Sequence, residues 1–398
     1  MPDTLHSAAP VTPASAAAAR LQGLDGLRGL AMLMVIACHL NVLWIGWTGL
    51  ASFFVLSGFL ITRILLSDRA QAESLGGYFR RFYIRRTLRV FPIYYIYLLL
   101  LTVAALTVPA LTAVRGELPT AFLYLYNFHM MFPHEHTRTL GHLWSLSVEE
   151  QFYLVWPWVV AFLSRSALRN LCMALIVIGP LLRWWTANVL LPAWGLEGPP
   201  QSLIYMYIFT GTHLDGFAFG ALLNLVDVRA RDWQVGALLL VSLALGLLLN
   251  QGMDISPSAL GWPLFLPAAY QYTWGYSVVD LFWALTIAAI VGGSGAVKKL
   301  YTLPLLDYLG KRSYSTYIVH FPLLALMNPL WQKSMNLLGD LPGTAAFAVP
   351  YLAIVFAVSG LSFRYVETPI SELKDRFSTS RRKAAAASDG AGARAEAS

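Results

Sequence analysis

Charge is scarce in this sequence. Only 12% of its 398 residues are Asp, Glu, Lys or Arg, whereas 57% are hydrophobic. A typical soluble globular protein carries about 25% charged residues. Repeated apolar runs reach about 20 residues, which is long enough for a helix to cross the hydrocarbon core of a bilayer. The composition therefore excludes a soluble enzyme and predicts an all-α, polytopic integral membrane protein.

Cysteine and targeting signals are equally scarce. Cys38 and Cys172 are the two cysteines, and both lie in apolar segments, so the sequence offers no disulfide framework. Residues 1–23 lack the basic-then-apolar order of a cleavable signal peptide. Residues 1–23 and 371–398 are rich in Ala and other small or polar residues, and we predict that both form disordered cytoplasmic tails.

Ten segments are predicted to span the membrane. Acidic residues number 21 and basic residues 28, and a net charge of +7 could indicate a nucleic-acid partner. The basic residues instead gather in alternate loops, which is typical of the cytoplasmic side of a bacterial inner-membrane protein with both termini inside. We therefore expect no nucleic acid and ten spans, at 27–46, 49–66, 89–109, 148–163, 168–186, 203–226, 234–250, 277–295, 314–331 and 345–363.

The first predicted span carries Arg28 and His39, and Asp25 lies just before it. Arg28 and His39 are eleven residues apart, so on a helix they share one face and lie about 16 Å apart along the axis. Ionisable groups inside a membrane segment are expensive and usually mark a functional site. A histidine that is simply hydrogen-bonded within the helix bundle is the alternative.

Arginines and aromatic residues alternate in residues 78–92. Arg85 and Arg89 lie one helical turn apart and could grip one ligand together. The planar guanidinium donates two hydrogen bonds to a phosphate, and aromatic rings can stack on an adenine-like base. Such a site for a polyphosphate competes with a simpler role, in which the arginines anchor the loop at anionic lipid headgroups.

Two sets of polar residues lie near the fourth predicted span: histidines before it, and a Ser–Glu–Tyr series at its start. Several histidines, including His129, His134, His136 and His142, lie in residues 110–147, but their spacing matches no metal-ligand pattern, and we expect no metal. Ser145, Glu149 and Tyr153 then recur every fourth residue, so they share one helix face.

Six stretches in this order resemble the membrane-bound acyltransferase-3 family of bacterial O-acyltransferases. Each stretch is short, and their order makes the resemblance specific. They are the helix from Arg28 to His39 and residues 54–59, 85–92, 144–153, 314–320 and 365–369.

The resemblance implies a ten-helix acyltransferase domain over residues 24–370. Such proteins move an acyl group, usually acetyl, from cytoplasmic acyl-CoA to an acceptor hydroxyl, mostly of an envelope carbohydrate or glycolipid. Some members acylate macrolide-like small molecules instead. Many relatives carry an esterase-like domain after the membrane part, and because this sequence ends soon after the tenth predicted span, we expect any such domain to be a separate partner.

Residue roles follow from this chemistry. His39 is the candidate general base or transient acyl carrier, because imidazole titrates near neutrality. Asp25 and Arg28 would orient it or stabilise developing charge. Glu149 would hold the acceptor or tune the histidine. The remaining candidates are Arg85, Arg86 and Arg89 for the phosphates of coenzyme A, and Trp144, Ser145 and Tyr153 for substrate.

Other functions remain open at this point. A proton-coupled transporter or flippase of envelope precursors could use His39 and Glu149 for proton coupling, and a receptor-like membrane protein would have no turnover at all. The acyltransferase hypothesis requires acyl-CoA as donor substrate, no tightly bound cofactor, and contact with membrane lipids.

Overall fold

Helices form the regular structure of the computed structural model, which describes residues 21–132, 137–196, 201–251, 253, 256–264, 270–293 and 295–372. Within these ranges no strand occurs, so the predicted all-α fold is confirmed. Most of the two predicted tails (residues 1–20 and 373–398) and the pair His134 and His136 lie outside the described residues.

Six helical stretches of the described chain are long and apolar enough to cross a membrane. All ten predicted segments coincide with helices, while their number as membrane spans stays a prediction. The other four fall on α2 (Leu24–His39), α7 (Leu143–Phe162), the pair α10 (Gln201–Ile208) and α11 (Leu214–Leu222), and α16 (Ser313–Leu338). The six stretches are Trp44–Gln71, Leu75–Thr107, Arg165–Ala193, Asp232–Leu249, Gln271–Gly292 and Asp340–Glu372.

The chain divides into two compact units that alternate along the sequence. The first contains the described residues of Met1–Phe59 and Asp215–Ser313. Its helices are α2 (Leu24–His39), the first half of α3 (Thr48–Gln71), α11 (Leu214–Leu222), α12 (Asp232–Leu249), α13 (Tyr276–Gly292), α14 (Ala296–Tyr301) and α15 (Pro304–Lys311).

The second unit contains the described residues of Leu60–Leu214 and Tyr314–Ser398. Besides the end of α3 and short turns, its helices are α4 (Leu75–Thr107), α5 (Leu118–Phe122), α6 (Tyr126–His129), α7 (Leu143–Phe162), α8 (Arg165–Trp185), α9 (Leu191–Ala193), α10 (Gln201–Ile208), α16 (Ser313–Leu338) and α17 (Asp340–Ser362).

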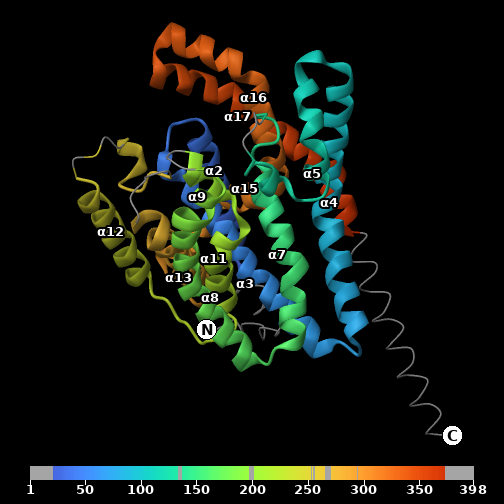
Figure 1. Cartoon of the computed structure of the whole chain (residues 1–398), viewed down its shortest axis with the longest axis vertical. Coiled ribbons are helices and arrows are strands. Elements are labelled where there is room, and N and C mark those ends of the chain that lie inside the picture. Colours follow the sequence, from blue (N-terminus) through green and yellow to red (C-terminus); the bar gives the residue numbers. More distant parts are fainter. Residues whose placement is uncertain are drawn as a thin grey trace, which may run out of the picture. The chain divides into compact units, whose positions relative to one another are not determined.

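Within the second unit, α16 and α17 run side by side (Figure 1). Gly339 joins them with a φ of 87°, a left-handed conformation that favours glycine. The rings of Trp331 and Phe347 stack with centroids 5.7 Å apart, and Trp331 donates a hydrogen bond to Thr344. The tight glycine turn thus brings two long helices into an antiparallel hairpin.

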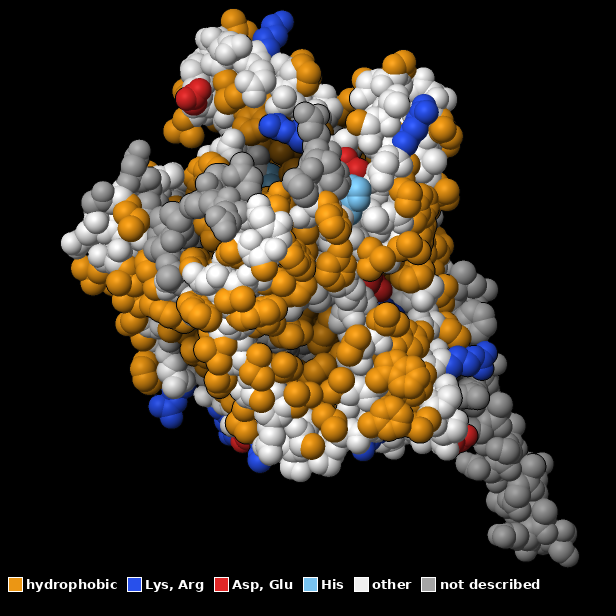
Figure 2. Space-filling model, viewed as in Figure 1, with side chains coloured by type: hydrophobic (Ala, Val, Ile, Leu, Met, Phe, Trp, Pro, Cys, Tyr) orange, Lys and Arg blue, Asp and Glu red, His pale blue; other side chains and the backbone are white. Residues whose placement is uncertain are grey.

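Apolar side chains cover much of the face seen in Figure 2. On α8 of the second unit, Val177 and Leu181 are 65% and 60% exposed. On α12 of the first unit, Leu240 and Val241 are exposed to a similar extent. Such patches are unfavourable in water but stable against lipid, as expected for a multi-pass membrane protein.

Candidate functional site

Asp25, Arg28 and His39 all lie on α2, as the sequence predicts. The guanidinium of Arg28 lies 2.6 Å from the carboxylate of Asp25, one turn earlier. His39 is the last residue of the helix, about 16 Å further along its axis. At that separation Arg28 cannot pair with His39, so the two residues serve different parts of any reaction.

Glycines let α2 approach α14 and α15 at backbone distance. A Cβ added to Gly310 would lie 1.6 Å from the carbonyl oxygen of Asp25, and one added to Gly29 would lie 2.2 Å from that of Leu306. Small residues permit this kind of helix contact in membrane proteins. The contact holds the Asp25–Arg28 end of α2 in place.

Lys311 adds a further charge near this end of α2. Its ammonium lies 2.6 Å from the carboxylate of Asp307 in the same helix. This hydrogen bond raises the pKa of Lys311, and the charges of Asp307 and Asp25 reinforce the shift. Asp25 therefore interacts with two positive charges, those of Arg28 and Lys311.

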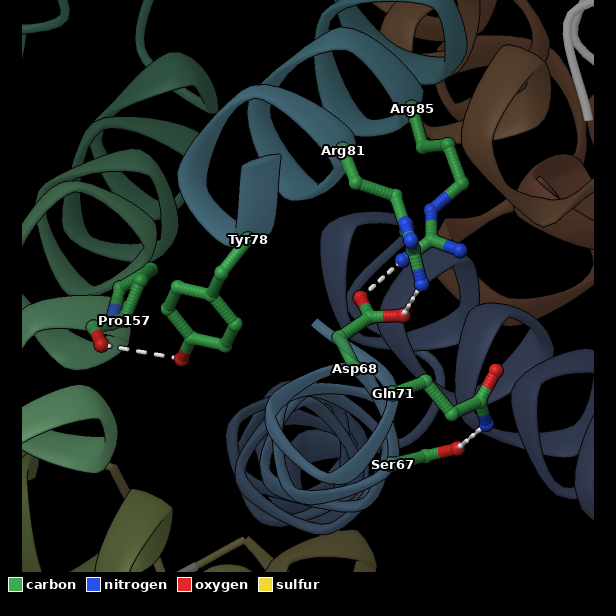
Figure 3. Close-up of polar contacts among 7 residues, drawn as sticks. All are labelled: Ser67, Asp68, Gln71, Tyr78, Arg81, Arg85 and Pro157. Atoms are coloured by element: carbon green, nitrogen blue, oxygen red, sulfur yellow. Dashed lines mark hydrogen bonds and ion pairs between the residues drawn. The ribbon is translucent and has the colours of Figure 1, made fainter. Parts of the chain in front are cut away.

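The arginine-rich stretch lies on α4 of the second unit, which begins after Ser74. The Ser74 hydroxyl accepts a hydrogen bond from the backbone N–H of Gly77 and so caps the helix. Arg81 and Arg85 point from successive turns toward one carboxylate, that of Asp68 near the end of α3 (Figure 3). The Asp68 side chain is only 7% exposed, whereas each arginine is 32% exposed. The guanidinium of Arg85 is therefore already paired with a carboxylate of the protein itself.

Arg86 differs from its neighbours because it points into the second unit. Its guanidinium lies 3.7 Å from the ring centroid of Tyr153 on α7, a cation–π contact. It also lies within electrostatic range of Glu149 and Glu150. Arg89, by contrast, is exposed. The three arginines thus have three different environments, although they are close in sequence.

Sequence reasoning missed three residues near Arg86, namely Glu150, Tyr124 and Tyr314. Glu150 lies within electrostatic range of Arg86, Tyr124 and Tyr314. The Tyr314 hydroxyl donates to the carbonyl oxygen of Val90 on α4 at 2.8 Å. A carboxylate next to Glu149 was visible in the sequence, but the contact of residues 124 and 314 with α7 requires tertiary structure.

Trp144 and Ser145 lie in the interior of the second unit. The Ser145 and Tyr317 hydroxyls are 2.5 Å apart, and Tyr317 also donates to the carbonyl oxygen of His142. The ring of Trp144 packs against Tyr207, with centroids 4.9 Å apart. These contacts join α7 to α16 and α10. Of the predicted substrate-binding residues, Tyr153 is the one that meets Arg86.

Metal binding finds no geometric support in the ranges that the structure covers. No group of three or more His, Cys, Asp or Glu side chains there is arranged around a common point. The ring of His129 stacks on Tyr126, with centroids 5.8 Å apart. The Nε2 atom of His142 lies 3.2 Å from the carbonyl oxygen of Ile318.

The match to a known protein family extends over residues of both units. A family model described as an acyltransferase domain matches residues 21–364. The chain belongs to the acyltransferase-3 family. This confirms the family that the ordered sequence stretches predict, and it supports an acyltransferase enzyme.

Curated relatives of this acyltransferase-3 chain include two named O-acetyltransferases. It is 30% identical over 359 residues to peptidoglycan O-acetyltransferase OatA of Listeria monocytogenes, covering 85% of this chain and 54% of the relative. It is 28% identical over 356 residues to O-acetyltransferase OatA of Staphylococcus aureus, covering 85% and 55%. The chain thus spans about half the length of these relatives. No solved structure matches it significantly.

Proposed function

We propose that this protein is an O-acetyltransferase of the bacterial inner membrane that moves an acetyl group from acetyl-CoA to a hydroxyl of an envelope carbohydrate or glycolipid. The family match over residues 21–364 carries the proposal. The names of the relatives support acetyl as the group and an envelope polymer such as peptidoglycan as the acceptor class.

The proposed reaction is a direct acyl transfer. The acceptor oxygen attacks the thioester carbonyl, the new C–O bond forms, the C–S bond breaks, and coenzyme A leaves as a thiolate. A sugar hydroxyl needs a base, and His39 takes its proton as the bond forms. The proton passes from His39 to the departing sulfur, which balances the step and restores the neutral imidazole.

The other charged candidates have separate roles. Asp25 and Arg28 form an ion pair that orients the start of α2, about 16 Å along the helix from His39, and so they serve the fold of this end and not the reacting atoms. Glu149 holds the acceptor. Arg89 binds a phosphate of the donor, since its side chain is exposed and its guanidinium suits phosphate.

Arg85 and Arg86 are each engaged by another residue of the protein, so neither is simply available to the phosphates of the donor. Arg85 is paired with Asp68, so phosphate binding by Arg85 competes with that carboxylate. Arg86 faces Tyr153 in the interior and is suited to the inner part of a bound donor.

The test uses the full chain purified in lipid nanodiscs. Radiolabelled acetyl-CoA is supplied with isolated peptidoglycan or envelope glycolipid, and both free thiol and labelled product are measured. Thiol release that depends on the acceptor, with a mass gain of one acetyl group on the glycan, supports the proposal. Failure to bind acetyl-CoA would refute it. If the label appears on a small molecule and not on a glycan, the protein is still an acyltransferase, but the proposed acceptor class is wrong.

A further inference from the structure

Several buried polar atoms of the second unit have no hydrogen-bond partner among the described residues, and they include the Nε of Arg86, the Oε1 of Glu150 and the hydroxyl oxygen of Tyr124. Most buried polar atoms in folded proteins are paired, and an unpaired one costs about 1–3 kcal/mol. Three such atoms in one region need a physical reason.

The three atoms belong to one cluster. Glu150 lies within electrostatic range of both Arg86 and Tyr124. Tyr314 lies within electrostatic range of Arg86 and Glu150 and hydrogen-bonds to Val90 on α4. Four segments therefore contribute: α4, the turn at residue 124, α7 and α16.

Tyr124 is held in a costly backbone conformation. Its φ is 53°, in the left-handed region that a bulky residue rarely adopts, at a cost of about 1–3 kcal/mol. Its ring stacks on Tyr94 with centroids 4.2 Å apart, and its carbonyl oxygen accepts a hydrogen bond from Gln151. The ring and the backbone are thus fixed, while the hydroxyl stays unpaired. Strain of this kind is typical of positions where a side chain is aimed at a ligand.

The donors and acceptors of the cluster define the chemistry of a ligand group. The Tyr124 hydroxyl and the Arg86 Nε–H are donors, and the Glu150 carboxylate oxygen is an acceptor. An amide matches this set, because its carbonyl oxygen accepts and its N–H donates.

We propose that Tyr124, Glu150 and Arg86 bind an amide of the pantetheine arm of the acyl-CoA donor. This inference rests on the proposed function, since it takes acetyl-CoA as the donor. The phosphate-binding candidate Arg89 and the inward-pointing Arg86 both lie on α4, and the cluster continues along this helix to Tyr94. A donor with its phosphates at the arginines would extend its arm along the same helix.

The experiment compares two ligands, one with the pantetheine arm and one without it. Acetyl-CoA carries it, whereas adenosine 3′,5′-bisphosphate has a nucleotide and phosphates without it. Binding of both to the full chain in nanodiscs is measured by calorimetry for wild type, Tyr124→Phe and Glu150→Gln. Tyr124→Phe removes one hydrogen bond, and Glu150→Gln weakens one by removing the carboxylate charge. Each variant should lower the affinity for acetyl-CoA by about tenfold and leave bisphosphate binding unchanged.

Tyr95→Phe is the matched control. The Tyr95 ring packs edge-on against Tyr124, but its hydroxyl already donates to the carbonyl oxygen of Phe122. Its removal should lower the melting temperature without selective loss of acetyl-CoA affinity.

Two results would overturn the inference. Equal losses for both probes would mean a general disturbance of the protein, and unchanged acetyl-CoA affinity in both folded variants would mean that the cluster serves the fold or the acceptor. If wild type binds acetyl-CoA and the variants bind it equally well, only this inference fails. If wild type does not bind acetyl-CoA, the proposed donor fails first.

Discussion

The carboxylate of Asp68 pairs with the guanidinium of Arg85, seventeen residues later, and so ties the end of α3 to α4 (Figure 3). Arg81 approaches the same carboxylate at 3.7 Å. A carboxylate held by two arginines resembles, in charge and geometry, the phosphate that such residues bind. Asp68 is therefore an internal competitor for an incoming anion.

Asp68→Asn should stabilise donor binding and destabilise the fold. Loss of one partner of a buried pair costs about 3–5 kcal/mol, and partial exposure of the arginines reduces this to about 1–3 kcal/mol. Acetyl-CoA affinity should rise several-fold because Arg85 becomes available, as measured by calorimetry. Asp227→Asn, which breaks an ion pair with Arg229 whose two side chains are each 84% exposed, should change neither quantity. Weaker acetyl-CoA binding in Asp68→Asn would show that the carboxylate orients the arginines for the donor.

Gly310→Ala should prevent α2 from packing on α15. The new methyl group would meet the carbonyl oxygen of Asp25 at 1.6 Å, and backbone atoms cannot move aside without separating the helices. We expect low yields of folded protein by size-exclusion chromatography in detergent. Gly236→Ala on α12 is the control, because nothing lies within 4 Å of its added Cβ and alanine favours a helix by about 1 kcal/mol. A normal yield and melting temperature for Gly310→Ala would contradict the close approach.

His39→Ala should lower acetyl transfer by a factor of about 10² to 10⁴, the range that a general base supplies. Acetyl-CoA affinity should stay the same, since the phosphate-binding candidates lie on α4. Initial rates and calorimetry on one preparation separate the two effects. His129→Ala removes a histidine that stacks on Tyr126 and should leave the rate unchanged. Full activity of folded His39→Ala would remove His39 from the mechanism.

Arg89→Ala should weaken acetyl-CoA binding by about tenfold through loss of one charge-assisted phosphate contact. The loss should shrink as salt increases, because exposed charges are screened. Titrations at two ionic strengths measure both effects. Arg169→Ala on α8 removes an arginine that is also exposed but lies outside the candidate site, and it is the control. If both variants lose the same affinity, Arg89 contributes only to the general positive charge.

Much of this protein could be predicted from local patterns in the sequence. Apolar runs located the helices, because a membrane segment must satisfy its backbone hydrogen bonds internally and so forms a helix. The spacing of Arg28 and His39 placed both on α2, since helical geometry depends only on residue number. The order of six short stretches identified the family, which the match over residues 21–364 confirms.

Partners distant in the sequence were beyond such reasoning. The arginines at 85, 86 and 89 look equivalent in the sequence, yet Asp68 engages the first, Tyr153 the second, and the third is exposed. Charge and spacing along one helix cannot distinguish them, because the difference comes from what α3 and α7 present to each face of α4.

The sequence by itself determined the all-helical fold and the position of His39 on α2, because each depends on residues near one another in the chain, and it determined the family through short local motifs in a fixed order. Only the tertiary structure decided that Arg86 faces inward beside Glu150 and that Tyr124 completes the cluster. That choice depends on packing between helices, where a side chain's surroundings come from residues far away along the chain.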